Sequence, residues 1–181
     1  MGKRIYLAGK IAPGDWRHDV VSGLRSAVTD DGDEPWSTLR SAVLNRFDYV
    51  GPFFISCDHR GLHGPNTHGV GANQVAGAEE CCGTAGLDAS IVVQRCMDAI
   101  EKADVFYAWL DNPTAFGTIA EIGYASGRAR QHIFPIFVAT PTDCPHERDF
   151  WFALQMHGVR HIRSTGPAAG LREALAILNW T

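Results

Sequence analysis

The segment from Asp104 to Asp111 constrains the fold most, because six consecutive apolar or aromatic residues lie between its two acidic ends. A strand with one face in water alternates apolar and polar residues, whereas a strand buried on both faces is apolar along its whole length. Both faces of this strand must therefore be covered. The pattern predicts a strand in the middle of a parallel sheet that has helices on its two sides.

Strand and helix patterns alternate along the rest of the chain. Further strands are predicted over 4–8, 48–57, 132–138 and 159–162. Helices are predicted over 16–28, 90–103, 117–130, 150–157 and 170–180. The pair Gly51-Pro52 interrupts the second strand, so we expect that strand near an edge of the sheet. The alternation predicts right-handed βαβ crossovers and an α/β fold with a mainly parallel, five-stranded sheet.

Composition narrows the classes of function. A chain of 181 residues with 45% hydrophobic residues suits one domain, 1–181. Its net charge of -4 argues against a nucleic acid polymer as partner, because such binding needs clustered Lys and Arg. No apolar run approaches the roughly 20 residues of a membrane span, and no signal peptide is evident. The five cysteines show no CxxC spacing, which indicates free thiols. We therefore expect a cytoplasmic protein that does not contact a membrane.

The stretch 58–86 is rich in Gly and His and, at about 29 residues, is longer than an ordinary connection. We expect it to be an active-site loop. Zinc is a lesser alternative, because the spacing of Cys57 and the histidines matches no zinc pattern. Asp58 and His63 are expected to bind substrate, and the imidazole of His59 could protonate a leaving base. No metal and no other cofactor is expected.

The region around Glu121 carries the clearest chemical signal. The buried strand ends at Asp111, Gly117 lets the backbone approach a ligand, and Glu121 follows about one turn into the next helix. The dipole of that helix should favour the ionised carboxylate. Since the helix is apolar on more than one side, Glu121 is expected to be largely buried, and a buried acid needs a functional reason. The alternative is a surface glutamate that complements the dipole.

Three segments together resemble the nucleoside 2-deoxyribosyltransferase superfamily, which includes nucleotide N-glycosidases. They are 4–9, 99–105 and 117–125, and the match in order and spacing extends from 4 to about 138, more loosely to 162. The resemblance implies a flavodoxin-like or Rossmann-like three-layer sandwich, no metal, and a homodimer or larger homo-oligomer whose sites borrow residues from a neighbour. It also implies that Glu121 attacks the anomeric carbon, giving a glycosyl-enzyme intermediate that a second base or water resolves.

The resemblance implies further site residues and also shows two departures. Cys96 stands where the family has an acid, and Ala115 replaces a second polar residue. Asp111 is a possible substitute acid, although it could instead cap a turn. Asp98 lies about 200° around the helix from Cys96 and should face elsewhere.

Several other positions are expected to contact the substrate. In the first loop, the Gly9 backbone and the Lys10 ammonium could contact an anion or sugar hydroxyls. Tyr6 either binds substrate or belongs to the core. Thr118 belongs to the Glu121 motif, and Gln155 falls where the family places a segment that enters a neighbouring site.

Two hypotheses follow. In the first, the protein is a deoxyribosyltransferase-like enzyme or an N-glycosidase that exchanges or hydrolyses the N-glycosidic bond of a nucleoside, or of a nucleotide 5′-monophosphate, through Glu121. In the second, it is a catalytically inactive sensor that binds a nucleotide with the same fold. A dehydrogenase does not fit, because no GxGxxG follows the first strand.

Overall fold

The computed structural model describes residues 2–10, 16–21, 44, 47–52 and 89–178. The elements along the chain are β1 (Lys3–Gly9), α1 (Arg17–Val20), β2 (Phe47–Gly51), α2 (Ala89–Lys102), β3 (Val105–Trp109), α3 (Phe116–Ala129), β4 (Ile136–Pro141), a 3-10 helix (Glu147–Phe150), α4 (Trp151–Leu154), β5 (Val159–Ser164) and α5 (Pro167–Ile177). The predicted loop residues Asp58, His59 and His63 lie outside the described residues, as does most of the predicted helix 16–28.

The five strands form one parallel sheet in the order β2-β1-β3-β4-β5. This order is the flavodoxin-like one, and it reverses direction between β1 and β3. The predicted α/β class, the five parallel strands and the edge position of β2 are therefore confirmed. Ligands of such folds bind beyond the carboxyl ends of the strands at the reversal point, which here means the loops that follow β1 and β3.

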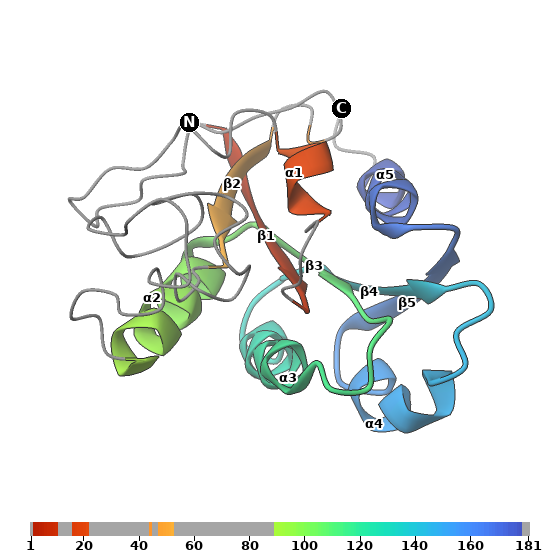
Figure 1. The fold of residues 1–181 in the computed structure, drawn as a ribbon. Coiled ribbons are helices and arrows are strands. Elements are labelled where there is room, and N and C mark those ends of the chain that lie inside the picture. The colour runs from red at the N-terminus through yellow and green to blue at the C-terminus, as the bar shows by residue number, and fades with distance from the viewer. Residues whose placement is uncertain (1, 11–15, 22–43, 45–46, 53–88, 179–181) are drawn as a thin grey trace, which may run out of the picture.

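Helices cover both faces of the sheet. Figure 1 shows α1 and α5 on one face, and α2, α3 and α4 on the other. Every residue of β3 is buried, as its apolar run predicts. Neighbouring residues of the strand point to opposite faces. Phe106 stacks on Tyr6 with ring centroids 5.6 Å apart, whereas Tyr107 contacts Trp16 edge-on at 5.9 Å and donates a hydrogen bond to the Pro167 carbonyl. The first contact joins β1 to β3, and the contacts of Tyr107 join the sheet to the start of α1 and of α5.

Two predicted helices have different bounds in the structure. The helix predicted over 150–157 is shorter in the structure: Phe150 ends a 3-10 helix, and α4 covers only Trp151–Leu154. Gly158 follows with a φ of +79°, a conformation that L side chains rarely adopt, and from there the chain enters β5. The closing helix begins at Pro167 and not at Gly170, because the fixed φ of proline suits the first turn of a helix.

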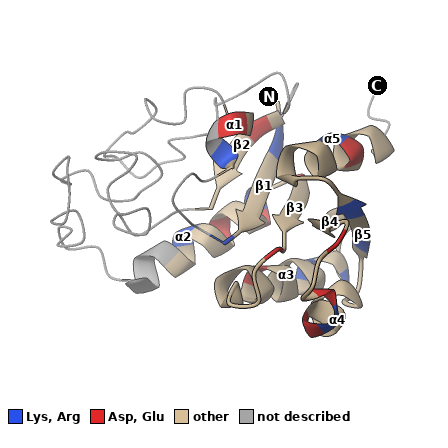
Figure 2. Ribbon diagram, turned by 45° about the vertical axis from the view of Figure 1, so that its right-hand side comes forward, with Lys and Arg blue, Asp and Glu red and all other residues tan. Residues whose placement is uncertain are grey.

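Basic side chains (Lys and Arg) are distributed over several of the described elements, and so are acidic side chains (Asp and Glu), as Figure 2 shows. Among the described helices, none is both long enough and apolar enough to cross a membrane.

Candidate active site

Tyr6 and Glu121 meet on the face of the sheet that α2 and α3 cover. The Tyr6 hydroxyl donates a hydrogen bond of 2.5 Å to Oε1 of Glu121, across 115 residues of sequence. Tyr6 is fully buried, and the thiol of Cys96, a buried residue of α2, interacts with the same hydroxyl. Three elements thus bring a tyrosine, a cysteine and a carboxylate together. Tyr6 holds one oxygen of the carboxylate in place.

Burial raises the pKa of the Glu121 carboxyl to about 7, and the Tyr6 hydrogen bond and the positive charge of Arg17 both oppose this rise. Glu121 as a whole residue is half-buried, but its carboxylate group is largely removed from water. The expectation that the ionised carboxylate is favoured is wrong, because burial raises the pKa and Glu121 lies five residues after the start of α3, where the dipole effect has faded. A carboxyl that titrates near neutrality can act as a nucleophile or as an acid-base group.

The Tyr6 hydroxyl stays protonated at neutral pH and donates its proton to the hydrogen bond with Glu121. Burial, the charge of Glu121 and the contact with Cys96 raise the pKa of its hydroxyl well above the ordinary value. Sequence reasoning left open whether Tyr6 binds substrate or lies in the core. The structure places the ring in the core and its hydroxyl on Glu121.

Arg17 is a site residue that sequence reasoning missed. β2 pairs with β1 only as far as Tyr6, which lies opposite Gly51. Beyond that point the buried Arg17 side chain donates to the carbonyl of Leu7 at 2.7 Å and to that of Gly9 at 2.9 Å. Its charge lowers the pKa of Glu121. An arginine just after a loop is ordinarily a surface residue. The sequence therefore does not indicate that Arg17 is buried or that its charge acts on Glu121.

The loops that follow β1 and β3 converge, as expected at the reversal of strand order. The Lys10 ammonium donates to Thr114 Oγ1 at 2.7 Å. Both the backbone N–H and the hydroxyl of Thr114 bond the side-chain oxygen of Asn112. Asp111 is exposed directly after β3. Lys10 therefore connects the loop after β1 to the loop after β3.

The remaining predicted residues differ in exposure. Thr118 is buried one turn before Glu121 on the same helix, and Ala115 is buried at the start of that helix. Gly117 is exposed, and a side chain there would meet no atom within 4 Å. Gln155 is exposed at the end of α4, and within the described part of the chain no hydrogen bond joins its side chain to Glu121.

Asp98 faces away from the site, as its position on the helix predicts. It is exposed and accepts a hydrogen bond of 2.7 Å from Gln94, whereas Cys96, two residues earlier, is buried. Asp98 therefore does not replace the acid that Cys96 lacks.

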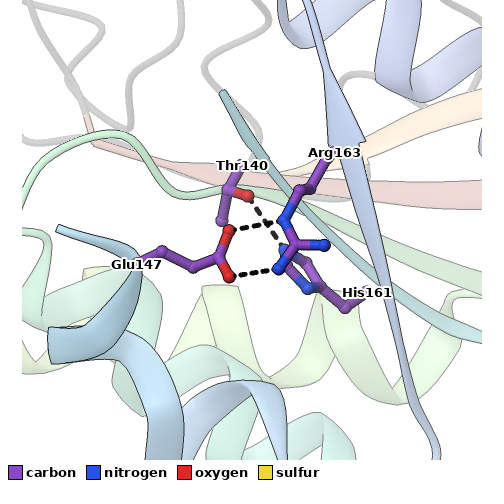
Figure 3. Close-up of polar contacts among 4 residues, drawn as sticks. All are labelled: Thr140, Glu147, His161 and Arg163. Atoms are coloured by element: carbon purple, nitrogen blue, oxygen red, sulfur yellow. Dashed lines mark hydrogen bonds and ion pairs between the residues drawn. The ribbon is translucent and has the colours of Figure 1, made fainter. Parts of the chain in front are cut away.

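A second polar cluster joins the 3-10 helix to the outer strands (Figure 3). Arg163 forms two hydrogen bonds to the Glu147 carboxylate, at 2.8 and 2.5 Å, and Thr140 contacts His161 at 2.9 Å. Burial lowers the pKa of His161. Arg163 is exposed and Glu147 is only partly covered, so solvent screens the pair and it contributes little to stability. Its role is to hold the segment before α4 on β5.

Fold and site together define a flavodoxin-like α/β protein with a desolvated, tyrosine-bound carboxylate beside the switch point of its sheet. No protein-family model and no curated protein matches the sequence. In the part of the chain that the structure describes, no group of three or more His, Cys, Asp or Glu side chains is arranged to hold a metal ion. The function is therefore argued from the geometry around Glu121.

Proposed function

We propose that this protein cleaves or exchanges the N-glycosidic bond of a nucleoside or nucleotide, with Glu121 as the nucleophile. The observation that carries the proposal is the Glu121 carboxylate, which is desolvated, has a pKa of about 7 and is held through Oε1 by Tyr6. A carboxylate of this kind suits a reaction in which positive charge develops on a sugar ring. The substrate is a small molecule that enters at the loops after β1 and β3.

The first step breaks the bond between the anomeric carbon and the base nitrogen. The electron pair of that bond leaves with the base, and the sugar acquires oxocarbenium character. Oε2 of Glu121 then forms an ester bond to the anomeric carbon, while Tyr6 keeps its hydrogen bond to Oε1. A second base resolves the ester in base exchange, and water resolves it in hydrolysis. Water regenerates the carboxylate and gives the free sugar.

The leaving base needs a proton in the first step. We assign this proton to Asp111, which is exposed after β3, or to His59, in the segment outside the described residues. The proposed binding residues near the carboxyl end of β1 are Gly9 and Lys10. Those in the first turn of α3 are Gly117 and Thr118. Asp58, His63 and Gln155 complete the proposed binding set.

A catalytically inactive, nucleotide-binding sensor is the second candidate. Its support is that Cys96 and Ala115 are 6% and 4% exposed and provide no acid, at positions where the family that the sequence resembles carries polar groups. In this case Glu121 would bind a sugar hydroxyl and would not attack carbon.

The test incubates the protein with ribo- and deoxyribonucleosides and their 5′-monophosphates, with and without acceptor bases. Wild-type protein should release or exchange a base, and Glu121→Gln should lower kcat at least about 1000-fold, as expected for the loss of a nucleophile. Free base without an acceptor indicates a hydrolase, and a new nucleoside only with an acceptor indicates a transferase. Glu173→Gln, which changes an exposed carboxylate of α5, is the matched control and should keep full activity. Wild-type protein that binds a nucleotide but leaves every substrate intact would establish the sensor instead.

A further inference from the structure

Arg17 closes the edge of β1 at the point where β2 ends. On one side of β1 the pairing with β3 continues to Gly9, opposite Trp109, whereas on the other side the pairing with β2 stops at Tyr6. Arg17 Nε donates to the Leu7 carbonyl at 2.7 Å, and Nη2 donates to the Gly9 carbonyl at 2.9 Å. Two buried carbonyls beyond the end of β2 thus receive the donors that buried backbone groups need.

The charge of Arg17 is not needed for these two hydrogen bonds, because a neutral amide also donates to carbonyls. The side chain is 0% exposed, and a guanidinium stays charged in proteins. Burial of a charge is costly unless other groups compensate for the lost water. The two carbonyls and the Trp16 ring, whose centroid lies 4.9 Å from Arg17 Cζ, offset part of this cost. A wholly buried cation at the carboxyl end of β1 therefore points to an electrostatic role.

Glu121 is the ionisable group on which this charge acts. Burial opposes the ionised form of the Glu121 carboxylate, whereas the Tyr6 hydrogen bond and the charge of Arg17 favour that form. Because the Arg17 side chain is buried, water and salt screen the interaction less than they would at the surface. Tyr6 holds Oε1 directly, and Arg17 acts from the edge of the same strand.

Few other groups can act on Glu121 from the elements that pack on α3. Of these elements, β4 and α4 carry no titratable side chain, and Tyr107 of β3 lies on the opposite face of the sheet. β1 contributes Tyr6, and α2 contributes Cys96. The charges of the other residues of β1 and α2 do not contribute to the pKa of Glu121: Lys3, Arg4, Arg95, Asp98, Glu101 and Lys102. Among the described residues, the stabilising charge comes from Arg17.

We propose that Arg17 is a positioning residue of the active site, whose fixed charge at the open edge of β1 stabilises the Glu121 carboxylate as a nucleophile. That Glu121 attacks a sugar rests on the proposed function, whereas the effect of the charge on the carboxylate does not. Without this charge a larger share of Glu121 would be protonated at neutral pH, and a protonated carboxyl is a poor nucleophile.

Two variants separate the charge of Arg17 from its hydrogen bonds. Arg17→Gln keeps an N–H donor but has no charge, and Arg17→Lys keeps both a donor and the charge. In protein labelled with ¹³C at the glutamate Cδ atoms, NMR follows the titration of Glu121, whose signal is identified by its absence in Glu121→Gln. The wild-type midpoint should be about 7. The midpoint should move upward in Arg17→Gln and stay close to the wild-type value in Arg17→Lys.

The matched control is Arg128→Gln. Arg128 of α3 likewise donates to two backbone carbonyls, those of Ile100 and Ala103, but its charge does not contribute to the pKa of Glu121. Its replacement should leave the midpoint unchanged, so a loss of hydrogen bonds alone is distinguished from a loss of charge. Circular dichroism verifies that each variant is folded, and trimethylamine N-oxide restores the fold of a variant that is partly unfolded.

The proposal is overturned if Arg17→Gln titrates at the wild-type midpoint. It is also overturned if Arg17→Lys moves the midpoint as far as Arg17→Gln does, because the charge would then not be the cause. An equal shift in Arg128→Gln would overturn it for the same reason.

The pH dependence of kcat/KM for base release gives a second readout. The ratio of Arg17→Gln to wild type should fall about 3- to 10-fold at pH 6 and change much less at pH 9, where both carboxyls are largely ionised. A raised midpoint in a protein that cleaves no nucleoside would support the role of Arg17 and reject the enzyme. A wild-type midpoint for Arg17→Gln in an active enzyme would do the reverse.

Discussion

Glu121→Gln should make the protein more stable above neutral pH while it removes turnover. The carboxyl has a pKa of about 7 in the folded protein and an ordinary value of 4.5. As pH rises from about 4.5 to 7, the unfolded chain loses this proton before the folded chain does, so the wild-type free energy of unfolding falls. The loss reaches roughly 3 kcal/mol at pH 8. Glutamine keeps a carbonyl oxygen for the Tyr6 hydrogen bond and has no charge to desolvate.

Urea unfolding of both proteins at pH 5 and pH 8 measures this effect. The difference between variant and wild type should be below about 1 kcal/mol at pH 5 and roughly 3 kcal/mol in favour of the variant at pH 8. Glu173→Gln, at an exposed position of α5, is the control and should show no such change with pH. A Glu121→Gln protein that is less stable than wild type at pH 8 would mean that the carboxylate is well solvated.

Gly51→Ala should disrupt both the fold and the site. A Cβ at Gly51 would lie 2.6 Å from Cε2 and 3.0 Å from Cδ2 of Tyr6. The Tyr6 ring can shift only by disturbing the surrounding core, because it is fully buried and stacks on Phe106. Overpacking of this kind costs typically 1–3 kcal/mol, and we expect a loss near the upper end. The displaced hydroxyl would also release Glu121 and raise the pKa of its carboxyl further.

Thermal unfolding and the pH dependence of base release together measure the two effects. The midpoint of the Glu121 titration should move upward in Gly51→Ala. Gly127→Ala is the control, because no atom lies within 4 Å of a Cβ there and the site is inside α3. It should gain roughly 0.5–1 kcal/mol from the better helix propensity of alanine. Equal stability of the two variants would contradict the packing of Tyr6 against β2.

The architecture was predictable because it depends on local patterns. The apolar run that became β3 requires cover on both faces, and the Gly51-Pro52 break correctly indicated an edge strand. The first and last residues of helices were predicted less accurately where they depend on single residues and not on a repeating apolar pattern. The 3-10 turn before α4 and the end of that helix at Leu154 have no distinct apolar period, so residues 150–157 resembled one helix.

The site was only partly predictable from the sequence. Glu121 was identified because its motif follows a buried strand, but its hydrogen bond with Tyr6 joins residues 115 positions apart. The raised pKa of Glu121 was also not predicted, because desolvation depends on how α3 packs on the sheet. Arg17 was missed as a site residue, since its role depends on where the β1–β2 pairing stops.

The central claim is that Glu121 forms a covalent bond to the sugar, and trapping that bond tests it most directly. Wild-type protein is mixed with a substrate found active, without an acceptor base, quenched in acid within milliseconds to seconds, and analysed by mass spectrometry after proteolysis. The proposal predicts a mass increase equal to the bound sugar on the peptide that contains Glu121, and no such increase in Glu121→Gln. Rapid base release with an unmodified Glu121 peptide at every quench time, or base release by Glu121→Gln at the wild-type rate, would contradict it.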